Sequence, residues 1–127
     1  LAKDKKIIAV LFADNKPSIN LINKIKKIQF DGILIDIKNK KKGNLKNYLN
    51  IKNLENFVKV SKKENLTIGL AGSLNIKDIS TLIKLKPDYL GFRGALCTEN
   101  KRKDNINEIS LNRVISRFRF FSFQKTI

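Results

Sequence analysis

The side chains that could take part in catalysis lie close together around the end of an apolar run at residues 32–37. Asp36 belongs to that run, and Lys38 and Lys40 follow shortly after it. A neutral lysine amine can attack a carbonyl carbon to form an imine, and neighbouring cations or burial favour the neutral amine. A nearby carboxylate can carry the protons. In so lysine-rich a chain a solvated loop also explains this spacing, and from spacing alone it is the better interpretation.

Two further positions combine glycine with a polar side chain, Gly72-Ser73 and Arg93-Gly94. Glycine lets backbone N–H groups approach an anion, and the amino end of a following helix favours negative charge. An arginine can hold a phosphate through two hydrogen bonds. We therefore favour a phosphate site over a simple turn and helix cap. Asp14 follows the first apolar run and is a further candidate carboxylate.

The composition excludes several kinds of active site. The chain of 127 residues has no histidine and one cysteine, so Ser-His-Asp and Cys-His catalysis and the common zinc sites are ruled out, and we expect no metal. A single cysteine allows no internal disulfide, which favours a reducing, cytoplasmic location. No apolar run approaches the roughly 18–20 residues of a membrane helix, so we expect no membrane partner.

Four apolar runs alternate with amphipathic stretches that have helical spacing. The runs lie at residues 5–12, 32–37, 66–71 and 89–92. Helices are expected to begin near Pro17, Asn50 and Asn75 and after a polar loop at 98–107. Their inner faces are predicted to carry Leu21, Ile22, Ile25 and Ile28; Ile51, Leu54, Phe57 and Val58; Ile76, Ile79, Leu82 and Ile83; and Leu111, Val114, Ile115, Phe118 and Phe121.

This alternation predicts an α/β fold of βαβαβαβα order with parallel strands and right-handed crossovers. Four such units can form a small open sheet or half of a (β/α)8 barrel, and a whole barrel needs about 250 residues. An isolated half would expose two apolar edge strands. The chain also has no methionine. We therefore expect residues 1–127 to be one domain, the C-terminal half of a TIM barrel, cut from a longer chain.

A weak internal repeat accompanies this pattern. Asp31 and Asp88 each lie between the end of an expected helix and the start of the next expected strand. Those strands end in the charged residues Asp36 and Arg93, which strand polarity places at one edge of the sheet with the other candidate groups.

The net charge of +16 raises the question of nucleic-acid binding, because lysine and arginine neutralise phosphates. The lysines are spread along the chain, on the solvent sides of the first three expected helices, however, and no known nucleic-acid-binding motif is present. The excess lysine accompanies many asparagines and isoleucines, as in chains from AT-rich genomes. We therefore expect no nucleic-acid partner.

Four stretches together carry a likeness to one enzyme family. They are Phe12-Ala13-Asp14, Asp31 to Asp36 with Lys40 and Gly43, Gly69 to Leu74, and Pro87 to Cys97. In combination they resemble the second half of (5-formylfuran-3-yl)methyl phosphate synthase, and the likeness extends from Ile7 to about Ser116. That family is a (β/α)8 barrel lyase. It condenses two molecules of glyceraldehyde 3-phosphate into a furan aldehyde phosphate, with loss of phosphate and water.

The resemblance implies lysine (Schiff-base) chemistry with no metal and no cofactor, and a product destined for methanofuran-type cofactors. It assigns Lys40, Asp36 and Asp14 to catalysis. By the same resemblance, the residues Gly72, Ser73, Arg93 and Gly94 bind substrate phosphate and Arg102 is a loop arginine. The implied partners are a triose phosphate and either the missing N-terminal half or further copies of the chain.

The sequence departs from the family pattern in places. Lys38 stands where the family has a small residue, so that Asp36-Ile37-Lys38-Asn39 looks like the family's first-strand motif, whose lysine forms the imine. Because everything after Gly43 matches the second half, Lys40 is the first assignment and Lys38 the second. The imine lysine of the family belongs to the first half, outside this chain.

Two other functions remain open from the sequence. One is another phosphate-binding barrel enzyme of the class I aldolase type. The other is a basic module that binds a polyanion without catalysis. Reversible aldol cleavage would identify the former, and salt-sensitive affinity for arbitrary duplex the latter.

Overall fold

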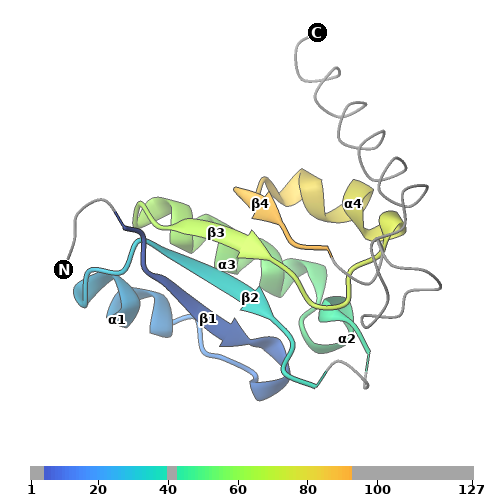
Figure 1. The fold of residues 1–127 in the computed structure, drawn as a ribbon, viewed down its shortest axis with the longest axis horizontal. Helices are drawn as coiled ribbons and strands as arrows, with labels where there is room; N and C mark the ends of the chain where they lie inside the picture. The colour runs from blue at the N-terminus through green and yellow to red at the C-terminus, as the bar shows by residue number, and fades with distance from the viewer. Residues whose placement is uncertain (1–4, 40–42, 93–127) are drawn as a thin grey trace, which may run out of the picture.

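The computed structural model describes residues 5–39 and 43–92, and within them four parallel strands form one sheet in the order β1-β2-β3-β4 (Figure 1). The strands are β1 (Ile8–Phe12), β2 (Gly32–Asp36), β3 (Thr67–Leu70) and β4 (Tyr89–Leu90). Each strand pairs with the next one along the chain. The predicted parallel α/β architecture is therefore confirmed for these residues. The last expected helix, at 111–121, lies outside them.

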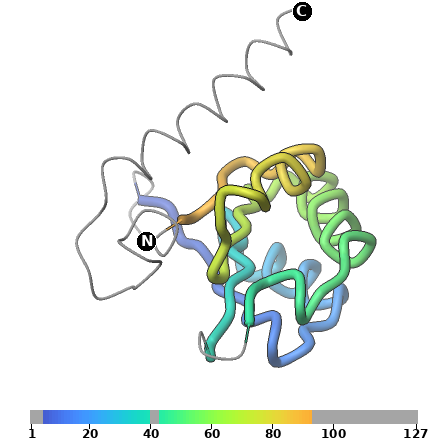
Figure 2. Tube along the Cα trace, turned by 90° about the vertical axis from the view of Figure 1, so that its right-hand side faces the viewer, coloured from blue at the N-terminus to red at the C-terminus, as the bar shows by residue number. Residues whose placement is uncertain are grey.

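The helices that connect the strands lie on one side of the sheet (Figure 2). They are α1 (Leu21–Lys27), α2 (Leu45–Tyr48), α3 (Ile51–Lys63) and α4 (Ile76–Leu82), with short 3-10 turns η1 (Ala13–Asn15) and η3 (Ile83–Leu85). None of the helices in this described part is long and apolar enough to cross a membrane.

The hydrophobic core lies between the sheet and these helices. Alternate residues of β2 and β3 point into it, and Ile33, Ile35, Ile68 and Leu70 are fully buried. On the helical side the core contains Ile22 and Ile25 from α1; Leu54, Phe57 and Val58 from α3; and Ile79 and Leu82 from α4. These helical residues are at positions that the 3.6-residue spacing predicts.

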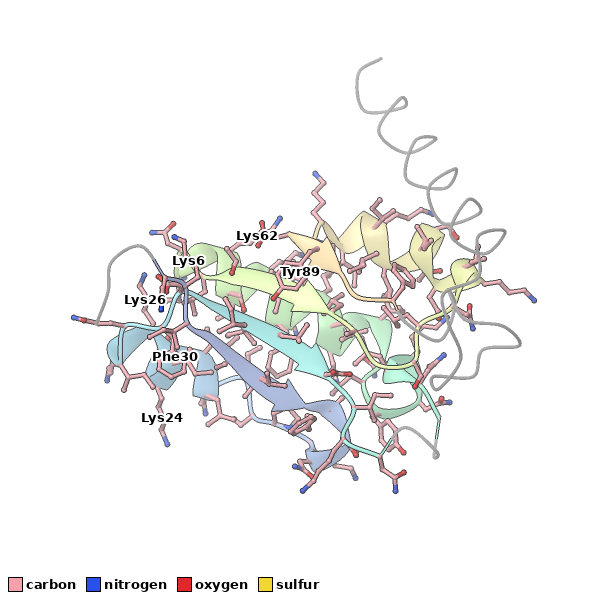
Figure 3. The ribbon with its side chains drawn as sticks, viewed as in Figure 1. Lys6, Lys24, Lys26, Phe30, Lys62 and Tyr89 are labelled. Carbon is pink, nitrogen blue, oxygen red and sulfur yellow. The ribbon has the colours of Figure 1, made fainter. Side chains whose placement is uncertain are left out.

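No described element covers the opposite face of the sheet. The strand register places Val10, Leu34, Gly69 and Tyr89 in one row across that face. Val10 is 47% exposed and Tyr89 40% exposed. The Tyr89 ring lies over Gly69, where an added Cβ would come within about 2 Å of it (Figure 3). An apolar parallel sheet normally has cover on both faces, so this face has the composition of an interior.

Asp31 and Asp88 directly precede β2 and β4 and make the same pair of hydrogen bonds, which confirms this part of the predicted repeat. β2 ends in Asp36, whereas Arg93 lies outside the described residues. The Asp31 N–H donates to the Ile7 carbonyl at 2.8 Å, and its carboxylate accepts the Ile7 N–H at 2.8 Å. Asp88 makes the same pair of bonds to Ile68, at 2.8 and 2.7 Å. Each aspartate thus fixes the start of one strand against its neighbour.

Local predictions differ from the structure at a few places. α1 begins at Leu21 rather than near Pro17. Ile28, expected on the inner face, is 60% exposed because α1 ends at Lys27 and Ile28 already belongs to its carboxyl cap. Ile51 is 38% exposed in the first turn of α3. α2 is a helix that the sequence analysis does not predict, because a single turn is too short to show helical periodicity.

Candidate active site at the carboxyl edge of the sheet

The parallel strands all end at one edge of the sheet (Figure 1). Several of the candidate polar residues directly follow these strand ends. Asp36 is the last residue of β2 and pairs in register with Phe12, the last residue of β1. Asp14 follows in η1, and Gly72-Ser73 follows β3. The structure therefore brings together Asp14, Asp36, Gly72 and Ser73 as the sequence predicts. Lys40, Arg93, Gly94 and Arg102 lie outside the described residues.

The Asp14 carboxylate holds the beginning of the loop after β2. Its Oδ1 accepts the N–H of Lys38 at 2.9 Å, and its Oδ2 accepts the N–H of Asn39 at 3.0 Å. The hydrogen bond from Lys38 is the largest cause that lowers the pKa of Asp14, and its own burial opposes this only in part. Asp14 is therefore a carboxylate that orients the lysine loop. A catalytic role for it stays a prediction.

Asp36 lies at the carboxyl end of β2, on the sheet face that no described element covers. Alternation along β2 places its side chain on the same side as Leu34, and it is half-buried. Its Oδ1 accepts the N–H of Ile37 at 2.7 Å. That bond orients the carboxylate at the edge where Lys38, an exposed residue, continues the chain. This position suits a group that carries protons to and from a bound substrate.

The turn after β3 contains two successive residues with positive φ. Gly72 has φ +120° and Ser73 has φ +52°, both in the left-handed region. An added Cβ at Gly72 would lie 2.5 Å from the Ile37 side chain, so the site requires glycine. The Gly72 carbonyl accepts the Leu45 N–H at 2.9 Å.

The amino end of α4 is capped by its own residues. The Asn75 side chain accepts the Lys77 N–H at 3.0 Å, and the Asp78 carboxylate accepts the Asn75 N–H at 2.8 Å. Asp78 is only 2% exposed and pairs with Lys46 Nζ at 2.6 Å. Because the first turn of α4 already holds a carboxylate, the amino end of this helix adds little to the predicted phosphate site.

The ion pair between Lys46 and Asp78 is not predicted from the sequence, because nothing distinguishes Lys46 from the many other lysines of the chain. Two capping boxes frame it, Asn44 with Asn47 and Asn75 with Asp78. The asparagine at the first and the polar residue at the fourth position of each box are a signal that could have located α2. Within the described ranges no three aspartate, glutamate, histidine or cysteine side chains are grouped to hold a metal ion.

Comparison with known proteins identifies the family of the chain. The family model described as 4-HFC-P synthase matches residues 1–115. A protein of Archaeoglobus fulgidus named (5-formylfuran-3-yl)methyl phosphate synthase is 29% identical over 98 residues, which cover 73% of this chain and 42% of that protein. A protein of Methanococcus maripaludis with the same name is 33% identical over 85 residues, which cover 62% of this chain and 36% of that protein.

A protein of Methylorubrum extorquens that provisionally carries the same name is 35% identical over 102 residues, 80% of this chain and 43% of that protein. The chain thus spans less than half the length of the curated relatives it matches. The match of the family model over residues 1–115 nevertheless includes every strand and helix described above. The chain belongs to the 4-HFC-P synthase family.

Proposed function

We propose that the protein containing this chain condenses two molecules of glyceraldehyde 3-phosphate into (5-formylfuran-3-yl)methyl phosphate, with loss of phosphate and water. The observation that carries the proposal is the family match over residues 1–115, together with Asp36, Lys38 and the Gly72-Ser73 turn at one edge of a parallel sheet. In that reaction the protein is a carbon–oxygen lyase. Its product would serve the synthesis of methanofuran-type cofactors.

We further propose that the chain forms the C-terminal half of a (β/α)8 barrel. The helices cover one face of the sheet, while Val10 and Tyr89 on the other face remain substantially exposed. The free edges belong to β1 and β4 among the described strands. A second four-stranded half would cover that face and pair with both edges. The relatives are long enough to contain such a half, since the matched part is 43% or less of each relative compared above.

The proposed chemistry uses an amine and a carboxylate near the same substrate. A neutral lysine amine adds to a substrate carbonyl, and loss of water gives an imine, which makes the neighbouring C–H easier to deprotonate. By family resemblance the imine lysine belongs to the first half of the barrel, and Lys40, with Lys38 as second choice, acts beside it. Asp36 would carry protons, and Gly72, Ser73, Arg93 and Gly94 would hold phosphate.

Intact mass spectrometry of the natural protein tests this function. The protein is incubated with glyceraldehyde 3-phosphate and reduced with borohydride, which fixes an imine as a stable amine. A protein near twice the mass of this chain that gains an adduct and releases a furan aldehyde supports the complete synthase. Reversible aldol cleavage without furan product would support a class I aldolase instead. A protein of this chain's mass that gains no adduct would need a partner with the imine lysine or would be inactive.

A further inference from the structure

The loop after β2 is held at both of its ends by bonds to other strands' loops. At its start, the Asp14 carboxylate accepts the N–H groups of Lys38 and Asn39. At its end, the Leu45 N–H donates to the Gly72 carbonyl at 2.9 Å. The candidate lysine, Lys40, lies in the chain between these two attachments.

The second attachment includes an ion pair that reaches further into the fold. Lys46, in α2, contacts Asp78 in the first turn of α4 at 2.6 Å. Asp78 is 2% exposed, whereas the Lys46 side chain is 35% exposed. A buried carboxylate without its cation is strongly unfavourable, so any other position of α2 would leave the Asp78 charge incompletely compensated.

Both partners of the pair are linked to the candidate phosphate turn through neighbouring residues. Asp78 also accepts the N–H of Asn75 and so fixes the segment that follows Gly72-Ser73. α2 also packs closely against the turn, because an added Cβ at Gly72 would lie 3.3 Å from the Leu45 side chain. The loops after β2 and β3 are therefore joined through adjacent residues of α2, one by a backbone bond and one by an ion pair.

We propose that Lys46 is a positioning residue, which through its ion pair with Asp78 holds α2 against α4 and thereby keeps the Gly72-Ser73 turn in one fixed position. This inference rests on the proposed function, since it assigns Lys46 to the support of that same site. Lys46 does not itself contact the reacting atoms. Its contribution is to keep the Gly72-Ser73 turn in the position at which that turn would hold the substrate phosphate.

Steady-state kinetics of the intact natural protein with glyceraldehyde 3-phosphate tests the inference. In Lys46→Met, we expect kcat/KM to fall on the order of ten- to a hundred-fold, as for other small displacements of reacting groups. Inhibition by inorganic phosphate should weaken in parallel. Lys46→Arg keeps the ion pair and should recover most of both quantities. The matched control is Lys59→Met, which breaks an exposed ion pair with Glu55 in α3 and should leave both unchanged.

The double variant Lys46→Met with Asp78→Asn separates positioning from folding. It leaves no buried carboxylate without a cation, and the asparagine oxygen can still accept the Asn75 N–H, so we expect a folded protein with the same kinetic defect. Wild-type kcat/KM and phosphate inhibition in either folded variant would overturn the inference while the proposed function stands. A wild-type protein that makes no furan aldehyde would overturn the proposed function and this inference with it.

Discussion

The two ends of the sheet use the same residue type for different purposes. At the amino end, the carboxylates of Asp31 and Asp88 each accept a backbone N–H of the neighbouring strand. At the carboxyl end, Asp14 accepts N–H groups of a loop, and Asp36 accepts the N–H of the residue that follows it. The amino-end bonds join strands, whereas the carboxyl-end bonds orient loops around the candidate site. Barrel enzymes divide stability and catalysis between their ends in this way.

The largest effect should come from Asp36→Asn at the carboxyl end. The asparagine oxygen can still accept the Ile37 N–H, so the fold should be kept while the group that we propose to move protons is lost. We expect furan formation from glyceraldehyde 3-phosphate to fall by roughly 10²- to 10⁴-fold. The assay is product absorbance, with urea denaturation to confirm the fold. Asp31→Asn is the matched control and should retain activity, so equal losses in both variants would remove the distinction between the ends.

The next largest effect should come from Asp31→Ala and Asp88→Ala at the amino end. Each removes a charged acceptor of a part-buried N–H, and we expect the free energy of unfolding to fall by about 1–3 kcal/mol. The folded fraction should keep its activity. Urea denaturation followed by circular dichroism measures the change. Asp31→Asn retains an acceptor and should recover most of the stability, and a variant that stays stable but loses activity would contradict a purely structural role.

A smaller, pH-dependent effect is expected for Asp14→Asn. The Lys38 N–H lowers the pKa of Asp14 in the folded protein below the reference value of 3.8. The ionised carboxylate therefore adds stability above that value, and the contribution is lost as the pH falls through the folded pKa. The stability difference between the wild type and Asp14→Asn should be present near neutral pH and vanish in acid. A difference independent of pH in denaturation series would show that charge is not responsible.

The smallest effect should come from Lys59→Met, which breaks the exposed 3.3 Å ion pair with Glu55. An exposed i,i+4 pair in a helix contributes about 0.3–0.5 kcal/mol. The unfolding midpoint in urea should therefore barely move. A loss as large as that in Asp31→Ala would mean that lysine side chains on the helices contribute more than the strand-entry aspartates.

Much of the fold could be predicted because it follows from local patterns. The apolar runs at 32–37 and 66–71 locate β2 and β3, and the spacing of Leu54, Phe57 and Val58 identifies the inner face of α3. Asn50 and Asn75 cap their helices as predicted, each with a side chain that accepts an N–H. Short-range hydrogen bonds and side-chain spacing decide these features, so they can be read from neighbouring residues.

The arrangement of the candidate site could be predicted only in part from the sequence. The alternation of strands and helices requires parallel strands, and parallel strands bring Asp14, Asp36 and Gly72-Ser73 to one edge of the sheet. It could not predict that Asp14 accepts N–H groups from Lys38 and Asn39, which are 24 and 25 residues away in the chain. Such bonds depend on how the loops lie once the strands have paired.

The sequence by itself thus determined the order of strands and helices, the caps, and the edge of the sheet at which polar groups gather. Only the tertiary structure decided which lysine pairs with the buried Asp78 and how the loop after β2 is attached at both ends. The physical reason is that local spacing fixes periodicity, whereas an ion pair such as Lys46 with Asp78 forms only after distant segments pack together and exclude water.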